Sequence, residues 1–153
     1  MASVLDVAAY VLQKSGPITA MKLQKLVYYA QSWHAVWTDS RLFPEDFEAW
    51  ANGPVSPVLY KKHRGRFTVD DTLEGLGDAS ALTADEAESV DAVLSYYGTM
   101  RAAQLIELTH REQPWMDARG DLLPGDRGFE TIPFAAMAEY YGSLHAGASA
   151  EEG

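Results

Sequence analysis

An apolar repeat that begins after Thr19 limits the possible folds of this chain more than any other segment. Within it, apolar and aromatic side chains recur every three or four residues, the spacing of one face of an α-helix. The repeat comprises Leu23, Leu26, Val27, Ala30, His34 and Trp37. Because threonine is a frequent N-cap, Thr19 marks its start. The pattern predicts a long helix, and we expect the rest of the protein to be built around it.

Signals of the same kind predict further helices. Ser3, Ser56 and Thr83 are capping residues, and Thr83 and Glu86 have the spacing of a capping box. The further predicted helices cover residues 4–14, 57–64, 84–97, 100–109, 114–119 and 131–141. Alternation over residues 47–51 predicts a short strand, and residues 65–80 are expected to form a long loop. The predicted fold class is mainly α, a compact single-domain bundle of about six helices with a small β element near residues 46–52.

Composition narrows the class of protein. The chain has 153 residues, of which 47% are hydrophobic, so it can bury the core of one domain. It has no cysteine, which excludes disulfides, zinc–thiolate sites and cysteine nucleophiles. The longest charge-free stretch, Leu26 to Thr38, is too short to span a bilayer, and Asp6 does not fit an export signal. We expect a cytoplasmic protein with no membrane partner, with one domain over residues 1–141 and a disordered tail over residues 142–153.

The charge is unevenly distributed along the chain. The net charge is −10, and residues 71–153 hold sixteen of the 22 acidic residues. Such a surface repels phosphates and favours basic protein partners, which argues against nucleic acid as a partner. One alternative stays open: residues 3–29 could form a helix-turn-helix that presents Lys22, Gln24 and Lys25 to DNA, next to the basic run 61–66. That run also fits the end of a helix, where the helix dipole favours cations.

Residues for catalysis or metal binding are sparse. No histidine has a ligand partner three or four residues further on, and the four are His34, His63, His110 and His145. There is no phosphate-binding glycine loop and no nucleophile elbow. We therefore expect no cofactor, no metal and no enzymatic activity. The alternative with the least support is a hydrolase in which His110 acts with Glu112 or Asp117.

Three segments, in order, carry a likeness to a known family. They are Lys22 to Ala30 (KLQKLVYYA), Phe47 to Val55 (FEAWANGPV) with Tyr60 after it, and Leu105 to Trp115 (LIELTHREQPW) with Arg119 after it. Together they resemble the Panacea domain, the family of SocA-like and phage-associated antitoxins. Residues 132–141 resemble the closing helix of that family, so the likeness covers nearly the whole domain. Residues 65–82 contain no motif that we can match.

The resemblance implies a mostly helical antitoxin without enzymatic activity, commonly encoded beside its toxin and often on a mobile genetic element. Its partner would be a cognate protein toxin, neutralised by direct binding, and one branch of the family delivers its toxin to a AAA+ protease. The family motifs would then form the scaffold, with Gly53-Pro54 fixing a tight turn and Trp50 and Trp115 filling the centre. The scaffold residues are Leu26, Trp50, Gly53, Pro54, Val55, His110, Pro114, Trp115 and Arg119.

The aromatic residues suggest where a toxin would dock. Adjacent pairs such as Tyr28 and Tyr29 cannot both face one core from one side of a helix, because neighbouring residues differ by about 100° around it. Either some of them line a groove, or the long helix is buried on two sides. Exposed aromatics with charges at the rim are typical of interface hot spots. The predicted docking residues are Lys22, Lys25, Tyr28, Tyr29, Trp33, Tyr60 and Lys61.

Overall fold

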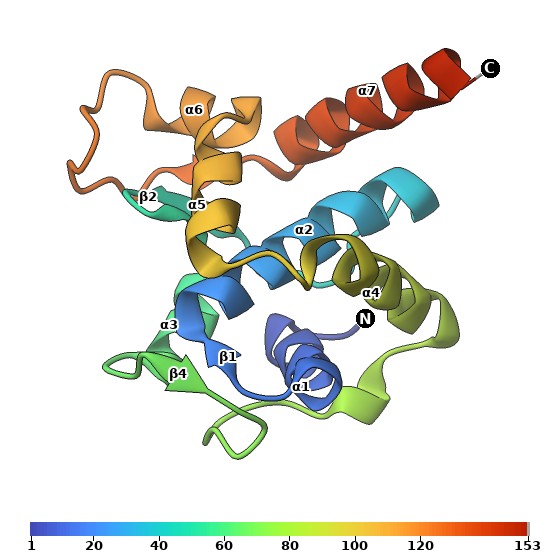
Figure 1. Cartoon of the computed structure of the whole chain (residues 1–153), viewed down its shortest axis with the longest axis vertical. Helices are drawn as coiled ribbons and strands as arrows, with labels where there is room; N and C mark the ends of the chain where they lie inside the picture. Colours follow the sequence, from blue (N-terminus) through green and yellow to red (C-terminus); the bar gives the residue numbers. More distant parts are fainter. Residues whose placement is uncertain (153) are drawn as a thin grey trace.

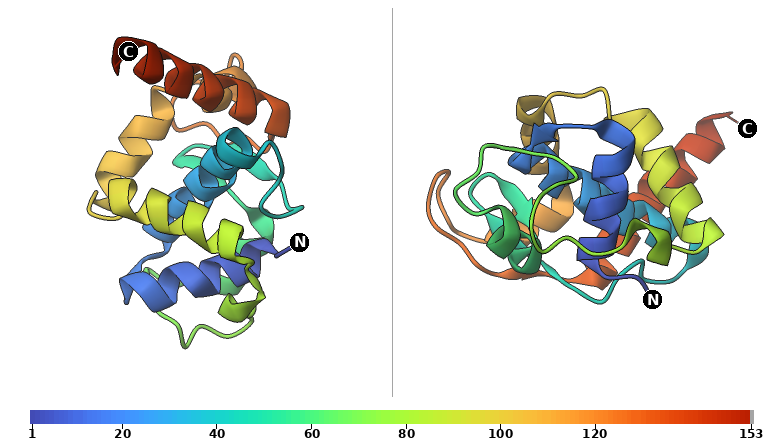
Figure 2. Two further views of the ribbon diagram at one scale, coloured as in Figure 1. Left: turned by 90° about the vertical axis from the view of Figure 1, so that its right-hand side faces the viewer. Right: turned by 90° about the horizontal axis from the view of Figure 1, so that it is seen from below.

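The computed structural model describes residues 1–152, with side chains described as far as Gly147. Helix α2 (Ala20–Thr38) runs through the middle of the molecule, as Figures 1 and 2 show. The longer helices that pack against it are α1 (Val4–Ser15), α4 (Ala84–Tyr97), α5 (Ala102–His110) and α7 (Phe134–Glu152). The shorter helices are α3 (Pro57–His63), α6 (Gln113–Arg119) and the 3-10 turn η1 (Ala79–Ala81). The expected mainly α fold is confirmed.

Local sequence sets where these helices begin. The Thr19 hydroxyl accepts a hydrogen bond from the Lys22 amide at 3.1 Å, which caps α2. Thr83 and Glu86 form the predicted capping box of α4. Each such cap stabilises its helix by about 1 kcal/mol, since it pairs an amide that the helix leaves free. The predicted bounds of α1, α2, α3 and α4 are confirmed closely.

Two small antiparallel sheets join the helices. In one, β1 (Ile18–Thr19) pairs with β4 (Thr68–Val69). In the other, β2 (Phe47–Trp50) lies between β3 (Gly53–Val55) and β5 (Thr131–Ile132). The predicted strand near residues 46–52 is confirmed as β2, whereas residues 65–80 hold β4 and part of η1 in addition to loop. Strands of two or three residues show no period of their own, so the sequence did not predict the other four.

The C-terminal helix is longer than the sequence predicts. We expected it to end near Tyr141, yet α7 continues to Glu152, while residue 153 lies outside the described residues. The extension contains three alanines, which favour a helix, and two glycines, which do not, so its sequence contains no clear helix signal. The division of the chain at Tyr141 into a domain and a tail stays a prediction.

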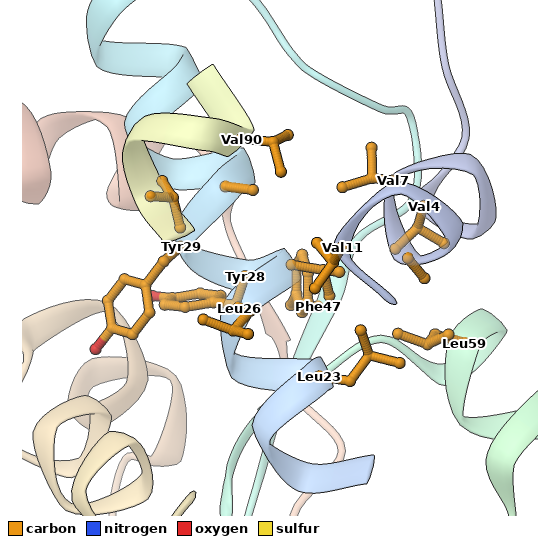
Figure 3. Packing of buried hydrophobic residues seen from close by; sticks show 14 of the residues in the cluster. Val4, Val7, Val11, Leu23, Leu26, Tyr28, Tyr29, Phe47, Leu59 and Val90 are labelled. Atoms are coloured by element: carbon orange, nitrogen blue, oxygen red, sulfur yellow. The ribbon is translucent and has the colours of Figure 1, made fainter. Parts of the chain in front are cut away.

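The core lies on more than one side of α2. Gln24, Lys25, Leu26 and Val27 are all fully buried, and four consecutive residues cover a complete turn of the helix. Figure 3 shows buried residues of α1, α2, α3 and α4 gathered there. The alternative of a helix buried on two sides is therefore correct. Within residues 1–152, no helix is long and apolar enough to cross a membrane.

Candidate functional site

The three segments that carry the family likeness meet in space. We call their meeting point the motif core and define it by Lys25 on α2, Gly53 and Pro54 on β3, and Thr109 on α5. The Lys25 ammonium donates a hydrogen bond to the Pro54 carbonyl at 3.0 Å. A Cβ on Gly53 would lie 2.6 Å from Lys25 Cε and 2.8 Å from Thr109 Oγ1. These residues therefore lock α2, the β2–β3 hairpin and α5 together.

Gly53 is required by two independent features. Its φ of +106° lies in the region that side chains with a Cβ rarely adopt, and it follows the turn that joins β2 to β3. The side chains of Lys25 and Thr109 also lie so close to Gly53 that there is no room for a methyl group on its Cα. The predicted turn at Gly53-Pro54 thus corresponds to the start of β3, and the glycine serves close packing as well as the turn.

Lys25 is a buried cation without an acidic partner. Its side chain is 0% exposed, and neither of the two ion pairs within the described residues includes it. Burial lowers the pKa of the Lys25 ammonium from 10.5 to about 7, because the charged form loses its water. The expectation that Lys25 lies exposed at the rim of a docking groove is wrong, since hairpin and helix residues enclose it.

A second buried polar contact fixes α3 to α2. The Gln24 side chain pairs with the Ser56 backbone twice, accepting from its amide at 2.8 Å and donating to its carbonyl at 3.2 Å. The Gln24 Nε2 atom also lies 2.9 Å from Nε2 of His63. Because Gln24 and Lys25 are both fully buried, the helix-turn-helix considered as an alternative cannot present them to DNA.

A cluster of tyrosines surrounds the buried Glu112, the N-cap residue of α6. The Glu112 carboxylate accepts hydrogen bonds from the hydroxyls of Tyr29 at 2.6 Å and Tyr141 at 2.7 Å. The Tyr28 hydroxyl lies 3.2 Å from that of Tyr141. Burial raises the pKa of the Glu112 carboxyl, and the two donated hydrogen bonds lower it in part. The cluster ties α7 to α2, so Tyr28 and Tyr29 are core residues and their expected exposure is wrong.

His110 does not form the hydrolase pair considered from the sequence. Its ring stacks on Trp115 with centroids 4.1 Å apart, and its buried Nε2 has no hydrogen-bond partner in the described structure. Glu112 binds the tyrosines instead, and Asp117 accepts from the Gln113 side chain at 2.6 Å. Burial lowers the pKa of the His110 imidazole. No hydrogen bond within residues 1–152 joins His110 to either acid.

The remaining docking residues lie apart from one another. Lys22 is half-buried, and its ammonium donates to the Gly98 carbonyl at 2.6 Å. Trp33 is half-buried next to α7, where its indole N–H donates to the Tyr97 hydroxyl at 2.9 Å. Tyr60 is half-buried and Lys61 is exposed, both on α3. The structure therefore does not form the single groove expected between α2 and α3.

Tyr60 belongs instead to an aromatic row on another face. It packs against Trp50 with ring centroids 4.8 Å apart, and Trp50 packs against Phe129 at 6.0 Å. The Trp115 indole N–H donates to the Trp50 carbonyl at 2.8 Å. Trp50 and Trp115 are half-buried, so they lie at the margin and the expectation that they fill the centre is wrong.

Further apolar residues lie in the loop after α6 and were not among the predicted docking residues. Leu122 and Leu123 stand within residues 120–128, which are otherwise rich in glycine and aspartate. Both leucines and Phe129 are exposed. Large apolar residues inside an otherwise polar segment were the sequence signal for an exposed apolar surface.

Among the residues that the structure describes, no group of three or more His, Asp or Glu side chains could hold a metal ion.

Three further scaffold residues predicted from the sequence are Leu26, Val55 and Pro114. All three are buried, on α2, β3 and α6 respectively.

Comparison with known proteins identifies a family whose match includes all the residues of the motif core. The family model described as antitoxin SocA-like, Panacea domain, matches residues 23–116. Antitoxin SocA of Caulobacter vibrioides is 34% identical over 110 residues, which cover 65% of this chain and 58% of that protein. The chain thus matches less than two thirds of the length of this relative. No solved structure matches the chain.

Proposed function

Since this chain belongs to the antitoxin SocA-like, Panacea domain family, we propose that it is the antitoxin of a toxin–antitoxin pair. It neutralises a cognate protein toxin by direct binding, with no catalysis and no cofactor. The observation that carries the proposal is the family match over residues 23–116, and the identity to a curated antitoxin supports it.

The burial of the motif core supports the proposal that its residues stabilise the fold and that other residues contact the toxin. Lys25, Gly53 and Thr109 are all buried and are not accessible to a toxin. Toxin contact therefore falls to side chains outside this core, because binding free energy comes from groups that lose water when the partner arrives. Of the docking residues predicted from the sequence, only those with solvent access stay in the proposal: Lys22, Trp33, Tyr60 and Lys61.

We further propose that residues 1–141 suffice for this function in the cytoplasm, without bound nucleic acid. Degradation of the toxin by a AAA+ protease, with this chain as the adaptor, is the alternative mechanism. The two mechanisms differ in what happens to the toxin. A blocked toxin stays abundant and inactive, whereas an adaptor lowers its amount.

The test is co-expression with the protein encoded by the adjacent reading frame. We expect that protein to stop growth alone, and this chain to restore growth and to co-purify with it. Toxin abundance in the rescued cells separates blocking from degradation. Growth arrest that this chain does not relieve would overturn the antitoxin proposal.

Two single substitutions separate scaffold from contact. Tyr29→Ala should lower the melting temperature, because truncating a buried aromatic residue costs about 3–5 kcal/mol, while its folded fraction still binds toxin. Tyr60→Ala should leave the fold intact and weaken toxin binding by about tenfold or more. Tyr96→Ala, at an exposed tyrosine on α4, is the matched control and should bind normally.

A further inference from the structure

The segment between α6 and β5, residues 120–130, carries exposed apolar side chains on a loop that projects from the body of the molecule (Figures 1 and 2). Leu123 is 67% exposed, Phe129 is 60% exposed and Leu122 is 38% exposed. Large apolar side chains that are concentrated in one exposed segment mark interaction surfaces more often than scattered ones do.

Arg119, at the end of α6, holds this loop in place. Its guanidinium is buried, yet no carboxylate within the described residues pairs with it. It donates instead to the carbonyls of Leu123 at 3.0 Å, Asp126 at 2.9 Å and Ala49 at 3.3 Å. A buried charge is costly unless it is hydrogen-bonded, and here all three acceptors are backbone groups, two of them in the loop. The loop conformation is thus set by a buried arginine.

Two further contacts rigidify the same loop. The Asp126 carboxylate accepts from the Leu123 amide at 3.0 Å. Gly128 is buried so tightly that a Cβ there would lie 2.5 Å from Leu122 Cδ1 and 3.2 Å from the Ala49 carbonyl. The exposed leucines and Phe129 therefore stand on a backbone that is already ordered. Such pre-organisation lowers the entropy cost of binding.

The loop is continuous with the aromatic row described above. Phe129 contacts Trp50, and Trp50 contacts Tyr60. We name this surface the apolar ridge, formed by Tyr60, Trp50, Phe129, Leu122 and Leu123. Leu122 belongs to it because its Cδ1 lies against Gly128, the neighbour of Phe129, and Leu123 follows Leu122 in the chain.

The charges around the loop select the kind of partner. Asp121, Asp126 and Glu130 are exposed, and Arg127 is the only cation in residues 120–130. The whole chain also carries a net charge of −10. At its other end Tyr60 is followed by the exposed Lys61, so the acidic rim is confined to the loop. A partner with an apolar segment whose lysine or arginine residues lie beside the loop would match both the apolar side chains and the acidic rim.

We infer that the apolar ridge is the docking surface for a basic, apolar segment of the toxin, with residues 120–130 as its pre-organised end. This inference rests on the proposed antitoxin function and adds where the toxin binds and what chemistry it presents. Arg119 is a positioning residue in this scheme, since it touches the loop and not the partner.

The first test removes the apolar anchors. The double variant Leu123→Ser/Phe129→Ser should keep the melting temperature and weaken toxin binding by at least about 30-fold, the effect of losing a hot spot. The matched control is Phe67→Ser/Tyr96→Ser, which removes two comparably exposed side chains, 82% and 67% exposed, outside the ridge. It should bind as the wild type does.

The second test reverses the acidic rim. Asp121→Lys/Glu130→Lys should slow association by about tenfold at low salt and less at high salt, because rim charges act mainly on the rate of encounter. Asp71→Lys/Glu74→Lys changes the net charge equally on the exposed loop before η1, so it is the matched control. Equal slowing of association by both double variants would mean that net charge alone steers binding, and it would overturn the inference that the docking segment of the toxin is basic.

A third test concerns Arg119. Arg119→Lys keeps the positive charge but loses the fork that reaches two loop carbonyls. Hydrogen exchange at the amides of residues 121–128 should become faster, and toxin binding should weaken with α2 exchange unchanged. Unchanged loop exchange would overturn the role of Arg119 as the positioning residue.

The outcomes separate this inference from the proposed function. If wild type and Leu123→Ser/Phe129→Ser both restore growth and bind toxin equally, the ridge is not the docking surface, although the antitoxin function stands. If the wild type fails to restore growth, the proposed function fails and this inference fails with it. If the free protein is a dimer that the double variant converts to a monomer, the ridge binds a second copy and not the toxin.

Discussion

Replacing Lys25 with methionine should stabilise the protein at about pH 6. Methionine has nearly the length of the lysine stem, and the site around Lys25 is fully closed to solvent. Burial lowers the pKa of Lys25 from 10.5 to about 7. At 1.36 kcal/mol per pKa unit, keeping the charged form in the folded state costs about 5 kcal/mol below pH 7, relative to the unfolded chain.

One loss offsets part of this gain. The Pro54 carbonyl accepts a hydrogen bond from Lys25, and leaving it unpaired in the core costs about 1–3 kcal/mol. The net stabilisation expected of Lys25→Met is therefore about 2–4 kcal/mol at low pH. For a domain of this size, each kcal/mol raises the melting temperature by about 2–4 °C.

The pH dependence is the sharper part of the prediction. Between the folded pKa of about 7 and the unfolded value of 10.5, the unfolded chain binds more protons at Lys25 than the folded protein does. Wild-type stability therefore rises with pH across this window relative to the variant, by up to about 1.36 kcal/mol per pH unit. From about pH 6 to about pH 9.5, the advantage of Lys25→Met should shrink by about 3 kcal/mol.

Urea unfolding followed by tryptophan fluorescence measures this, with wild type and variant compared at each pH so that the titration of shared groups cancels. Lys61→Met, at an exposed lysine on α3, is the control and should change stability by less than about 0.5 kcal/mol at every pH. The reasoning is refuted if Lys25→Met is less stable than wild type at about pH 6, or if the difference between the two does not change with pH.

Three further substitutions test the motif core, the tyrosine cluster and α2. Gly53→Ala should lower the free energy of unfolding in urea by about 2–5 kcal/mol, because the new residue is strained at this φ and its Cβ would lie 2.6 Å from Lys25 Cε. A loss below about 1 kcal/mol would contradict the close packing. Glu112→Gln should gain stability relative to wild type as the pH rises from about 4 to 8, since burial raises the pKa of Glu112 and the stability contributed by its neutral form is lost as it ionises; parallel pH profiles would argue against a buried carboxyl. Leu26→Ala should lower stability by about 2–5 kcal/mol in thermal melts, because α2 has packed residues around it that cannot fill the cavity.

The sequence by itself determined the helices and the family. Ser3, Thr19 and Thr83 mark helix starts because each cap pairs with an amide three residues away, a contact that needs no partner from elsewhere in the chain. The spacing of apolar residues between Thr19 and Trp37 is likewise a local property of one helix. The order of three motif blocks was enough to indicate the antitoxin family, which the family match confirms.

Only the tertiary structure decided which side chains of α2 meet solvent. The periodicity of one helix shows which residues share a face, but it does not show how many neighbours enclose that helix. Helices on several sides and the β2–β3 hairpin bury Lys25, Tyr28 and Tyr29, all of which the sequence had placed on a docking surface. The apolar residues of segment 120–130 are visible in the sequence, but the conformation that exposes them is not, because it depends on a buried Arg119 that donates to backbone carbonyls of two separate segments. Exposure depends on contacts between segments distant in the chain, and no local pattern in the sequence encodes them.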